Sequence, residues 1–152
     1  LPPTEVDTGT LPEIETHLKG VADAGQPFSM RLSGTGTFRP LSPVVFLKIV
    51  DGGEACTRLQ TQVRDPAGPL RRELRFSYHP HVTVAHGIGD AALDRAFAEL
   101  SRYEVEWSCT GFALYEQGGD GIWRALREFT FHGPAVSAQP ASHVARGARS
   151  AR

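Results

Sequence analysis

A histidine-containing stretch near the middle of the chain, residues 76–86, constrains the fold more than any other segment. Its residues 81–84 are β-branched or ring-bearing, which favours an extended backbone. Pro80 pushes the residue before it, His79, towards extended geometry, and a proline is tolerated at the start of a strand. The pattern therefore predicts a β-strand that begins at Pro80 or directly after it.

The expected strand has two faces of different chemistry, because successive side chains point to opposite sides. We expect His81 and Thr83 to share one face, and Val82 and Val84 to point the other way into a core. His86 falls on the valine side if the strand is regular, and we interpret it as structural. An imidazole moves protons near neutral pH and a hydroxyl hydrogen-bonds an oxyanion, so His81 and Thr83 form a candidate site.

Two other interpretations of these residues remain open. His79 and His81 form a His-x-His pair, which also occurs in metal sites. A binuclear hydrolase pattern would need Asp where this chain has Thr83, and a cupin-like site would need a Glu that is absent between Val84 and Ala98. Alternatively, His81 and Thr83 are a hydrogen-bonded polar pair in a strand, without a catalytic role.

The tetrapeptide His81-Val82-Thr83-Val84 resembles the His-x-Thr-x signature of the 2H phosphoesterases, the superfamily of the 2′-5′ RNA ligases and RNA cyclic phosphodiesterases. Other segments agree with this resemblance. The run 26–38 looks like the family's strand and glycine turn, and the apolar run 44–50 and a helix before the motif also fit. The resemblance covers residues 1–131.

The resemblance implies an α+β fold in which antiparallel sheets, with helices on their outer faces, form two lobes around a central cleft. It implies a phosphodiesterase that opens 2′,3′-cyclic phosphates, or cleaves and forms 2′-5′ linkages, on an RNA end or a small cyclic nucleotide. His81 would be one of two acid/base histidines, and Thr83 one of the phosphate-binding hydroxyls. Each proton transfer is typically worth ~10²–10⁴-fold in rate, and hydroxyls stabilise charge on the nonbridging oxygens. No metal and no cofactor are expected.

The chain departs from the family in one respect, because it contains one His-x-Thr motif where family members carry two. Residues 1–6 resemble the segment that comes after the first motif in family members, so we expect the first histidine and hydroxyl to precede Leu1. Without them, cyclic-nucleotide hydrolysis should reach at most ~10⁻²–10⁻⁴ of the complete rate. The alternative function is a catalytically incomplete domain of this fold that binds a nucleotide or RNA. Many RNA-ligase-type relatives have Arg at the position of His86, which leaves the substrate class open.

The residues just before the motif are candidates for substrate binding. Tyr78 offers a ring for base stacking, and Arg75 belongs to a loop with Arg71 and Arg72 that leads into the strand. Arginine suits bidentate phosphate binding. A solvated loop is the commoner origin of such charge.

Hydrophobic periodicity and turn residues predict the remaining elements. A capping box at Thr10–Glu13 should start a helix that Gly25 ends, and Gly34–Gly36 should make a hairpin turn. The other expected elements are a strand at 44–50, helices at 54–64 and 91–102, and strands at 103–117 and 122–131 joined by a hairpin at 118–121.

Composition sets the broad class. The chain has 152 residues, of which 40% are hydrophobic and 22% charged, and this suits a globular domain at 1–132. A formal net charge of −1 indicates that any phosphate site is local. No long apolar run predicts a membrane span, and Cys56 and Cys109 lack metal-ligand spacing. We expect a cytoplasmic monomer with a disordered tail at 133–152.

Overall fold

The computed structural model describes residues 4–73 and 76–133 of the chain. In chain order its elements are η1 (Thr8–Thr10), α1 (Leu11–Ala24), β1 (Phe28–Thr37), β2 (Val44–Asp51), α2 (Gly53–Val63), β3 (His81–His86), α3 (Asp90–Glu99), β4 (Glu104–Cys109), β5 (Gly111–Gln117) and β6 (Trp123–Thr130).

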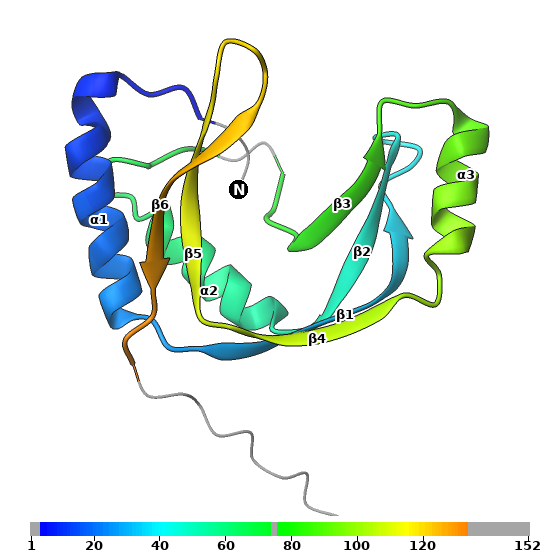
Figure 1. Ribbon diagram of the computed structural model, residues 1–152, viewed down its shortest axis with the longest axis horizontal. Coiled ribbons are helices and arrows are strands. Elements are labelled where there is room, and N and C mark those ends of the chain that lie inside the picture. Colours follow the sequence, from blue (N-terminus) through cyan, green and yellow to red (C-terminus); the bar gives the residue numbers. More distant parts are fainter. Residues whose placement is uncertain (1–3, 74–75, 134–152) are drawn as a thin grey trace, which may run out of the picture.

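Two antiparallel sheets organise these elements. The larger sheet has the strand order β3-β2-β1-β4, and the smaller one consists of β5 and β6. In Figure 1, α3 lies outside the larger sheet on one side of the molecule, and α1 lies outside β5 and β6 on the other. The predicted α+β class, with antiparallel sheets and helices on their outer faces, is confirmed.

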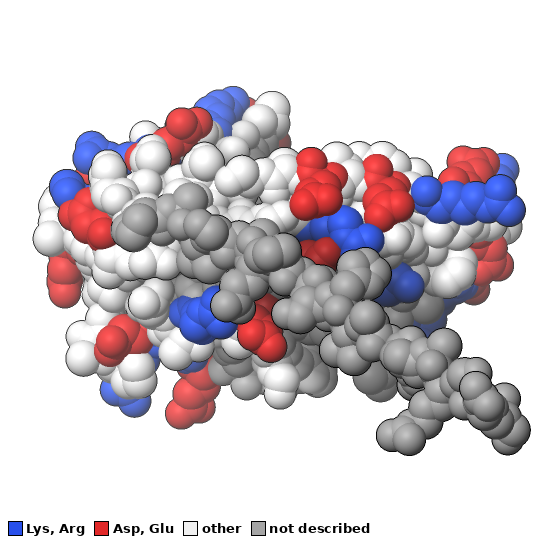
Figure 2. Space-filling model, turned by 90° about the horizontal axis from the view of Figure 1, so that it is seen from below, with Lys and Arg blue, Asp and Glu red and all other residues white. Residues whose placement is uncertain are grey.

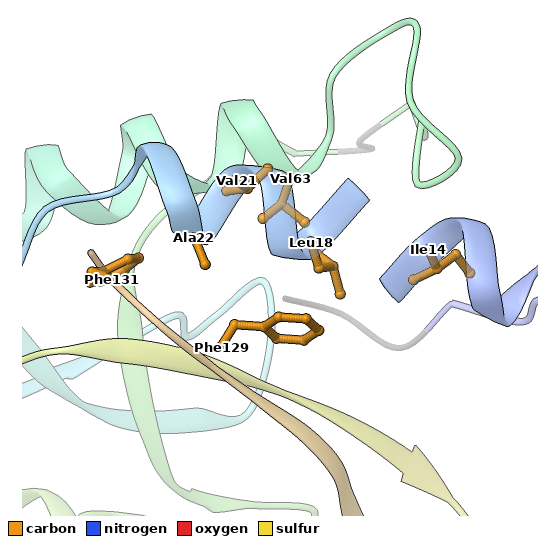
Figure 3. Packing of buried hydrophobic residues seen from close by; sticks show 7 residues of the cluster. All are labelled: Ile14, Leu18, Val21, Ala22, Val63, Phe129 and Phe131. Carbon is orange, nitrogen blue, oxygen red and sulfur yellow. The ribbon is translucent and has the colours of Figure 1, made fainter. Parts of the chain in front are cut away.

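The core beside the smaller sheet forms around one face of α1. Its buried residues follow the i, i+4, i+7, i+8 spacing of an amphipathic helix. They pack against the end of α2 and the last strand, as Figure 3 shows for Ile14, Leu18, Val21, Ala22, Val63, Phe129 and Phe131. Each large side chain buried here contributes roughly 1.5–3 kcal/mol, and this contact joins α1 to the β5–β6 pair.

A second apolar layer holds α3 against the larger sheet. Val45 and Leu47 of β2 are buried on this side, and Leu93 of α3 is fully buried. Thr35 of β1 lies on the same face and donates its hydroxyl to the carbonyl of Phe97 at 2.9 Å. The opposite face of this sheet, which carries Phe46, is therefore turned away from α3.

The predicted hairpin at Gly34–Gly36 is wrong, because β1 runs through it. The pairs Leu32–Ile49 and Thr35–Leu47 leave one extra residue in β1, which makes a β-bulge. Gly34 lies in this bulge with φ of +66°, a conformation that glycine adopts without strain. The Gly34–Gly36 segment therefore does mark an irregularity of the backbone, but the irregularity is a bulge and the chain does not reverse there.

The single strand predicted for residues 103–117 is two strands in two sheets. β4 pairs with β1, whereas β5 pairs with β6. Thr110 separates them, and its carbonyl accepts a hydrogen bond from Phe131 N–H at 2.8 Å. A side chain at Gly111 would collide with the Phe129 carbonyl, so a glycine permits the close approach at this crossing.

The start of α1 also differs from the prediction. Thr10 is its N-cap residue, but the Thr10 hydroxyl donates to the Asp7 carbonyl at 2.7 Å and makes no capping bond. The preceding turn η1 occupies this hydroxyl, so no capping box forms. The end of the helix is as predicted, with Gly25 as the C-cap.

The surface carries no single basic field on the face that Figure 2 shows, where acidic and basic side chains are interspersed. This agrees with the net charge of −1.

Within the described ranges, no helix is long and apolar enough to cross a bilayer. The tail predicted to be disordered lies almost wholly outside the described residues.

Candidate active site

The strand β3 presents His81 and Thr83 on one face, as predicted. It begins at His81, directly after Pro80. In the antiparallel pairing with β2, His81 lies opposite Lys48 and Thr83 lies opposite Phe46. Because residues paired across strands point to the same side, both side chains lie on the sheet face that is turned away from α3.

A bulge changes the face of His86. The pairs Phe46–Thr83 and Val45–Ala85 leave Val84 as an additional residue in β3. His86 then lies opposite Val44, which shares the face of Phe46. The prediction that His86 belongs to the opposite side is therefore wrong, since it assumed a regular strand.

The expected burial of the two valines is also wrong. Val82 is 40% exposed and Val84 is 38% exposed. The physical reason is the position of β3 at the edge of the sheet. The helix α3 buries Val45 and Leu47 of the neighbouring strand more completely than it covers this edge.

Four rings pack around the candidate site. The tilted rings of Phe38 and Phe46 have their centroids 4.5 Å apart, and the centroid of the His81 ring lies 5.0 Å from that of Phe38 and 5.1 Å from that of Phe46. His79 lies 5.7 Å from each phenylalanine and 6.0 Å from His81. The His81 ring therefore packs against the buried Phe46 and the partly buried Phe38, and it remains partly exposed itself.

A short hydrogen bond orients the imidazole of His81. Its Nδ1 atom lies 2.6 Å from the carbonyl oxygen of His79. A carbonyl accepts only, so Nδ1 is the donor, and in the neutral ring the lone pair is left on Nε2. This arrangement gives His81 a defined atom for taking up a proton.

Thr83 supplies a hydroxyl beside this ring. Its side chain is exposed, and it makes no hydrogen bond with another residue in the described part of the chain. The hydroxyl is therefore available to donate to an anionic oxygen on the face that carries His81.

Lys48 is a neighbour that the sequence analysis missed. It is exposed and lies opposite His81 on the adjacent strand, 33 positions earlier in the chain. One signal was present, because a lone charged residue interrupts the otherwise apolar run 44–50. Nothing in that run indicates which strand pairs with it, so the sequence did not link it to the His-x-Thr motif.

A charged group occupies the same sheet face further along. Arg31 of β1 contacts Asp51 at 2.5 Å and Glu104 at 2.9 Å. These two carboxylates raise the pKa of the Arg31 guanidinium above its ordinary value. Ser29 donates to Glu106 at 3.0 Å on the same face.

Two cavities at the surface are lined by other residues. One is lined by Arg39, Pro40, Pro43, Asp90 and Asp94, and the other by Gly53, Glu54, Thr57, Arg58 and Pro80. Neither is lined by His81 or Thr83. The candidate site is thus an open sheet face in this structure and not one of these cavities.

The other two predicted site residues are Tyr78 and Arg75, which we expected to bind substrate. Tyr78 is half-buried, and burial, with a smaller effect of Cys56, raises the pKa of its phenol. Arg75 lies outside the described residues. Substrate binding by Tyr78 and Arg75 stays a prediction.

The His-x-His pair acquires no further metal ligands in the described part of the chain. There, no group of three or more His, Cys, Asp or Glu side chains is arranged to hold a metal ion. Cys56 and Cys109 are free thiols.

The fold and the His-x-Thr strand define a phosphoesterase family. The family model described as the 2′-5′ RNA ligase superfamily matches residues 1–121, so the chain belongs to this superfamily. The predicted relationship to the 2H phosphoesterases is confirmed.

Individual relatives carry names of the same kind. The chain is 25% identical over 129 residues to a protein of Halalkalibacterium halodurans named "Putative phosphoesterase BH1439", covering 84% of this chain and 74% of that protein. It is equally similar to a Bacillus thuringiensis (strain Al Hakam) protein named "Putative phosphoesterase", covering 84% of this chain and 73% of that one. The crystal structure of TT0787 of Thermus thermophilus has a TM-score of 0.56 and 22% identity, covers 85% of this chain and 74% of that chain, and shows the shared fold.

Proposed function

We propose that this phosphoesterase-family chain opens 2′,3′-cyclic phosphates, or cleaves and forms 2′-5′ linkages, by acid/base catalysis without a metal. One observation carries the proposal. The Nδ1 atom of His81 is held by the His79 carbonyl at 2.6 Å, which leaves Nε2 as the proton-transfer atom on the face that carries Thr83. Membership of the superfamily supports a phosphoesterase reaction, and this geometry supports the roles that we propose for the two residues.

In the proposed reaction, water attacks the phosphorus of the cyclic phosphate and the bond from phosphorus to one ribose oxygen breaks. Nε2 of His81 either takes the proton from water or gives one to the leaving oxygen. The Thr83 hydroxyl donates a hydrogen bond to a nonbridging oxygen as its charge rises. The second proton transfer needs another group, and by resemblance it comes from a second His-x-Thr motif.

The proposed substrate is an RNA end or a small cyclic nucleotide. Both carry the phosphate that His81 and Thr83 would contact, and a base that an aromatic side chain such as Tyr78 would stack on. Arg75 would contribute affinity for the phosphate. We further propose that the protein acts as a monomer in the cytoplasm.

The test measures hydrolysis of 2′,3′-cyclic AMP and of a 2′-5′-linked dinucleotide in the presence of EDTA. It uses the 152-residue chain and the same chain together with any coding sequence upstream of Leu1. His81→Ala should lower turnover by ~10²–10⁴-fold without a change in the circular dichroism spectrum. The matched control is His132→Ala, since His132 is exposed and pairs with Asp23 away from β3.

Three outcomes would overturn this proposal. They are activity that EDTA removes, full activity of His81→Ala, and full activity that does not depend on Thr83. Saturable nucleotide binding without turnover in either form of the chain would instead favour the alternative, a binding domain of this fold. The single His-x-Thr motif in the 152 residues is the observation behind that alternative.

A further inference from the structure

Lys48 occupies an unusual place for a charged residue. It lies in the second strand of the four-stranded sheet, between the apolar residues Leu47 and Ile49. The residue two positions earlier on the same face, Phe46, is only 5% exposed. Lysine is depleted in strands, so a lysine in an interior strand and beside a packed aromatic residue is informative.

The register places this lysine next to the candidate catalytic histidine. Lys48 and His81 are direct partners in the pairing of β2 with β3, so their Cβ atoms are about 4.5–5.5 Å apart on one face. An extended lysine stem and an imidazole both rise from that face. A phosphate that meets His81 is therefore within reach of the Lys48 ammonium when the lysine stem points towards β3.

The lysine stem lies over the bulge in β1 in this structure. The Cε and Nζ atoms of Lys48 lie 3.5 and 3.6 Å from the point where a Cβ of residue 34 would be. That residue is Gly34, with φ of +66°. Because no side chain stands there, the flexible stem can lie over β1 or swing back towards β3.

The ammonium group also lacks a carboxylate partner in the described part of the chain. No ion pair or hydrogen bond of Lys48 is found there. Two acidic groups further along this face, Asp51 and Glu104, are both held by Arg31. The Lys48 ammonium is therefore left for an external anion, which it meets beside His81 when the stem turns from β1 towards β3.

We propose that Lys48 binds the nonbridging oxygens of the substrate phosphate whose reacting phosphorus meets His81 and Thr83. This inference rests on the proposed function and adds a cation to its site. The ligand is a phosphate monoester or diester of a nucleotide. An ammonium hydrogen-bonds such an oxygen as a point charge and strengthens the hold on the charge that develops during the reaction.

The test uses the fact that the sequence contains two lysines, Lys19 and Lys48. Reductive methylation with ¹³C-formaldehyde labels both, and Lys48→Arg and Lys19→Arg variants assign their NMR signals. Titration with inorganic phosphate and then adenosine 2′-monophosphate should shift the Lys48 signal saturably. Lys19, which pairs with Asp23 on α1, should not respond.

Variants give the affinity measurement. Lys48→Gln should weaken binding of adenosine 2′-monophosphate by ~10–100-fold, as expected for loss of a hydrogen bond to a charged group. Lys48→Arg should bind within a few-fold of the unaltered chain, and this rescue excludes simple misfolding. Lys19→Gln should bind unchanged.

The outcomes separate this inference from the proposed function. If the Lys48 signal shifts saturably but the chain shows no turnover, the phosphate site is supported and only the proposed catalytic function is contradicted. If turnover requires His81 but the Lys48 signal does not shift and Lys48→Gln binds with normal affinity, the proposed function stands and only the role of Lys48 is overturned. Parallel, unsaturable shifts of both lysines would show general ionic screening and would also overturn it.

Discussion

The Nδ1 atom of His81 lies 2.6 Å from the backbone carbonyl oxygen of His79. The two residues are separated by Pro80, which restricts His79 to extended geometry and so aims its carbonyl. Because this contact occupies Nδ1, it leaves Nε2 as the ring nitrogen available for proton transfer. The short segment before β3 is therefore part of the candidate site.

Pro80→Ala should loosen this contact without unfolding the sheet. We expect turnover to fall about 5-fold, the loss for one ordinary hydrogen bond, with KM unchanged because no substrate contact is removed. ¹⁵N NMR should show a single His81 tautomer in the unaltered chain and a mixture in the variant. Pro43→Ala, before β2, is the control, and an unchanged tautomer in Pro80→Ala would refute the positioning role.

Thr83→Val removes the hydroxyl with little change in shape. Loss of one donor to a developing oxyanion typically lowers turnover ~10²–10³-fold, and Thr83→Ser should retain most of the rate. Because Thr83 is exposed, stability should change by less than about 0.5 kcal/mol in either variant. Steady-state kinetics and urea unfolding check both points, and equal rates for Val and Ser would exclude the hydroxyl from the reaction.

Gly36→Ala should displace the aromatic support of the site. A Cβ at this position would lie 2.5 Å from the Phe46 ring, which in turn contacts His81. Overpacking of this kind costs about 1–3 kcal/mol, and we expect lower stability together with shifted His81 ring signals. Gly89→Ala is the control, since nothing lies within 4 Å of its Cβ position. A stable Gly36→Ala variant with unmoved His81 signals would contradict the proposed support.

Phe129→Ala tests the core that joins α1 to β6. Phe129 is 6% exposed and packs in the cluster of Figure 3. Its truncation should cost about 3–5 kcal/mol in urea unfolding. Leu41→Ala, at a position that is 90% exposed, should change stability by less than about 0.5 kcal/mol. Equal effects of the two would show that this cluster does not join α1 to β6.

The β5–β6 hairpin should respond to acid through Asp120. Hydrogen bonds from Arg124, and then from Ile122 N–H, lower the pKa of this carboxyl from 3.8 to about 2. The folded form is thus favoured above pH 3.8, and this contribution is lost as the pH falls from 3.8 through about 2. A ¹³C NMR titration should show a midpoint near 2 in the unaltered chain.

Arg124→Gln should return that midpoint towards 3.8. Arg127→Gln is the matched control, because Arg127 pairs with Glu15 and not with Asp120. An unaltered-chain midpoint near 3.8 would refute the ion pair at the hairpin turn.

Much of the local structure was predictable because it depends on neighbours in sequence. Pro80 and the β-branched residues after it indicated the start of β3, and the buried face of α1 followed from its apolar spacing. The glycine-rich turn between β5 and β6 was likewise predicted, and Gly121 has φ of +76° there. The family resemblance, carried by His81 and Thr83, was also readable from the sequence alone.

Tertiary structure decided what depends on pairing between distant strands. Bulges at Gly34 and Val84 are set by the register with β2, and they turned a predicted hairpin into one strand and moved His86 to the other face. The same register placed Lys48 opposite His81, although the two are far apart in the chain. Alternation along one strand predicts which side chains share a face, but only hydrogen bonding between strands determines which residues become neighbours across it.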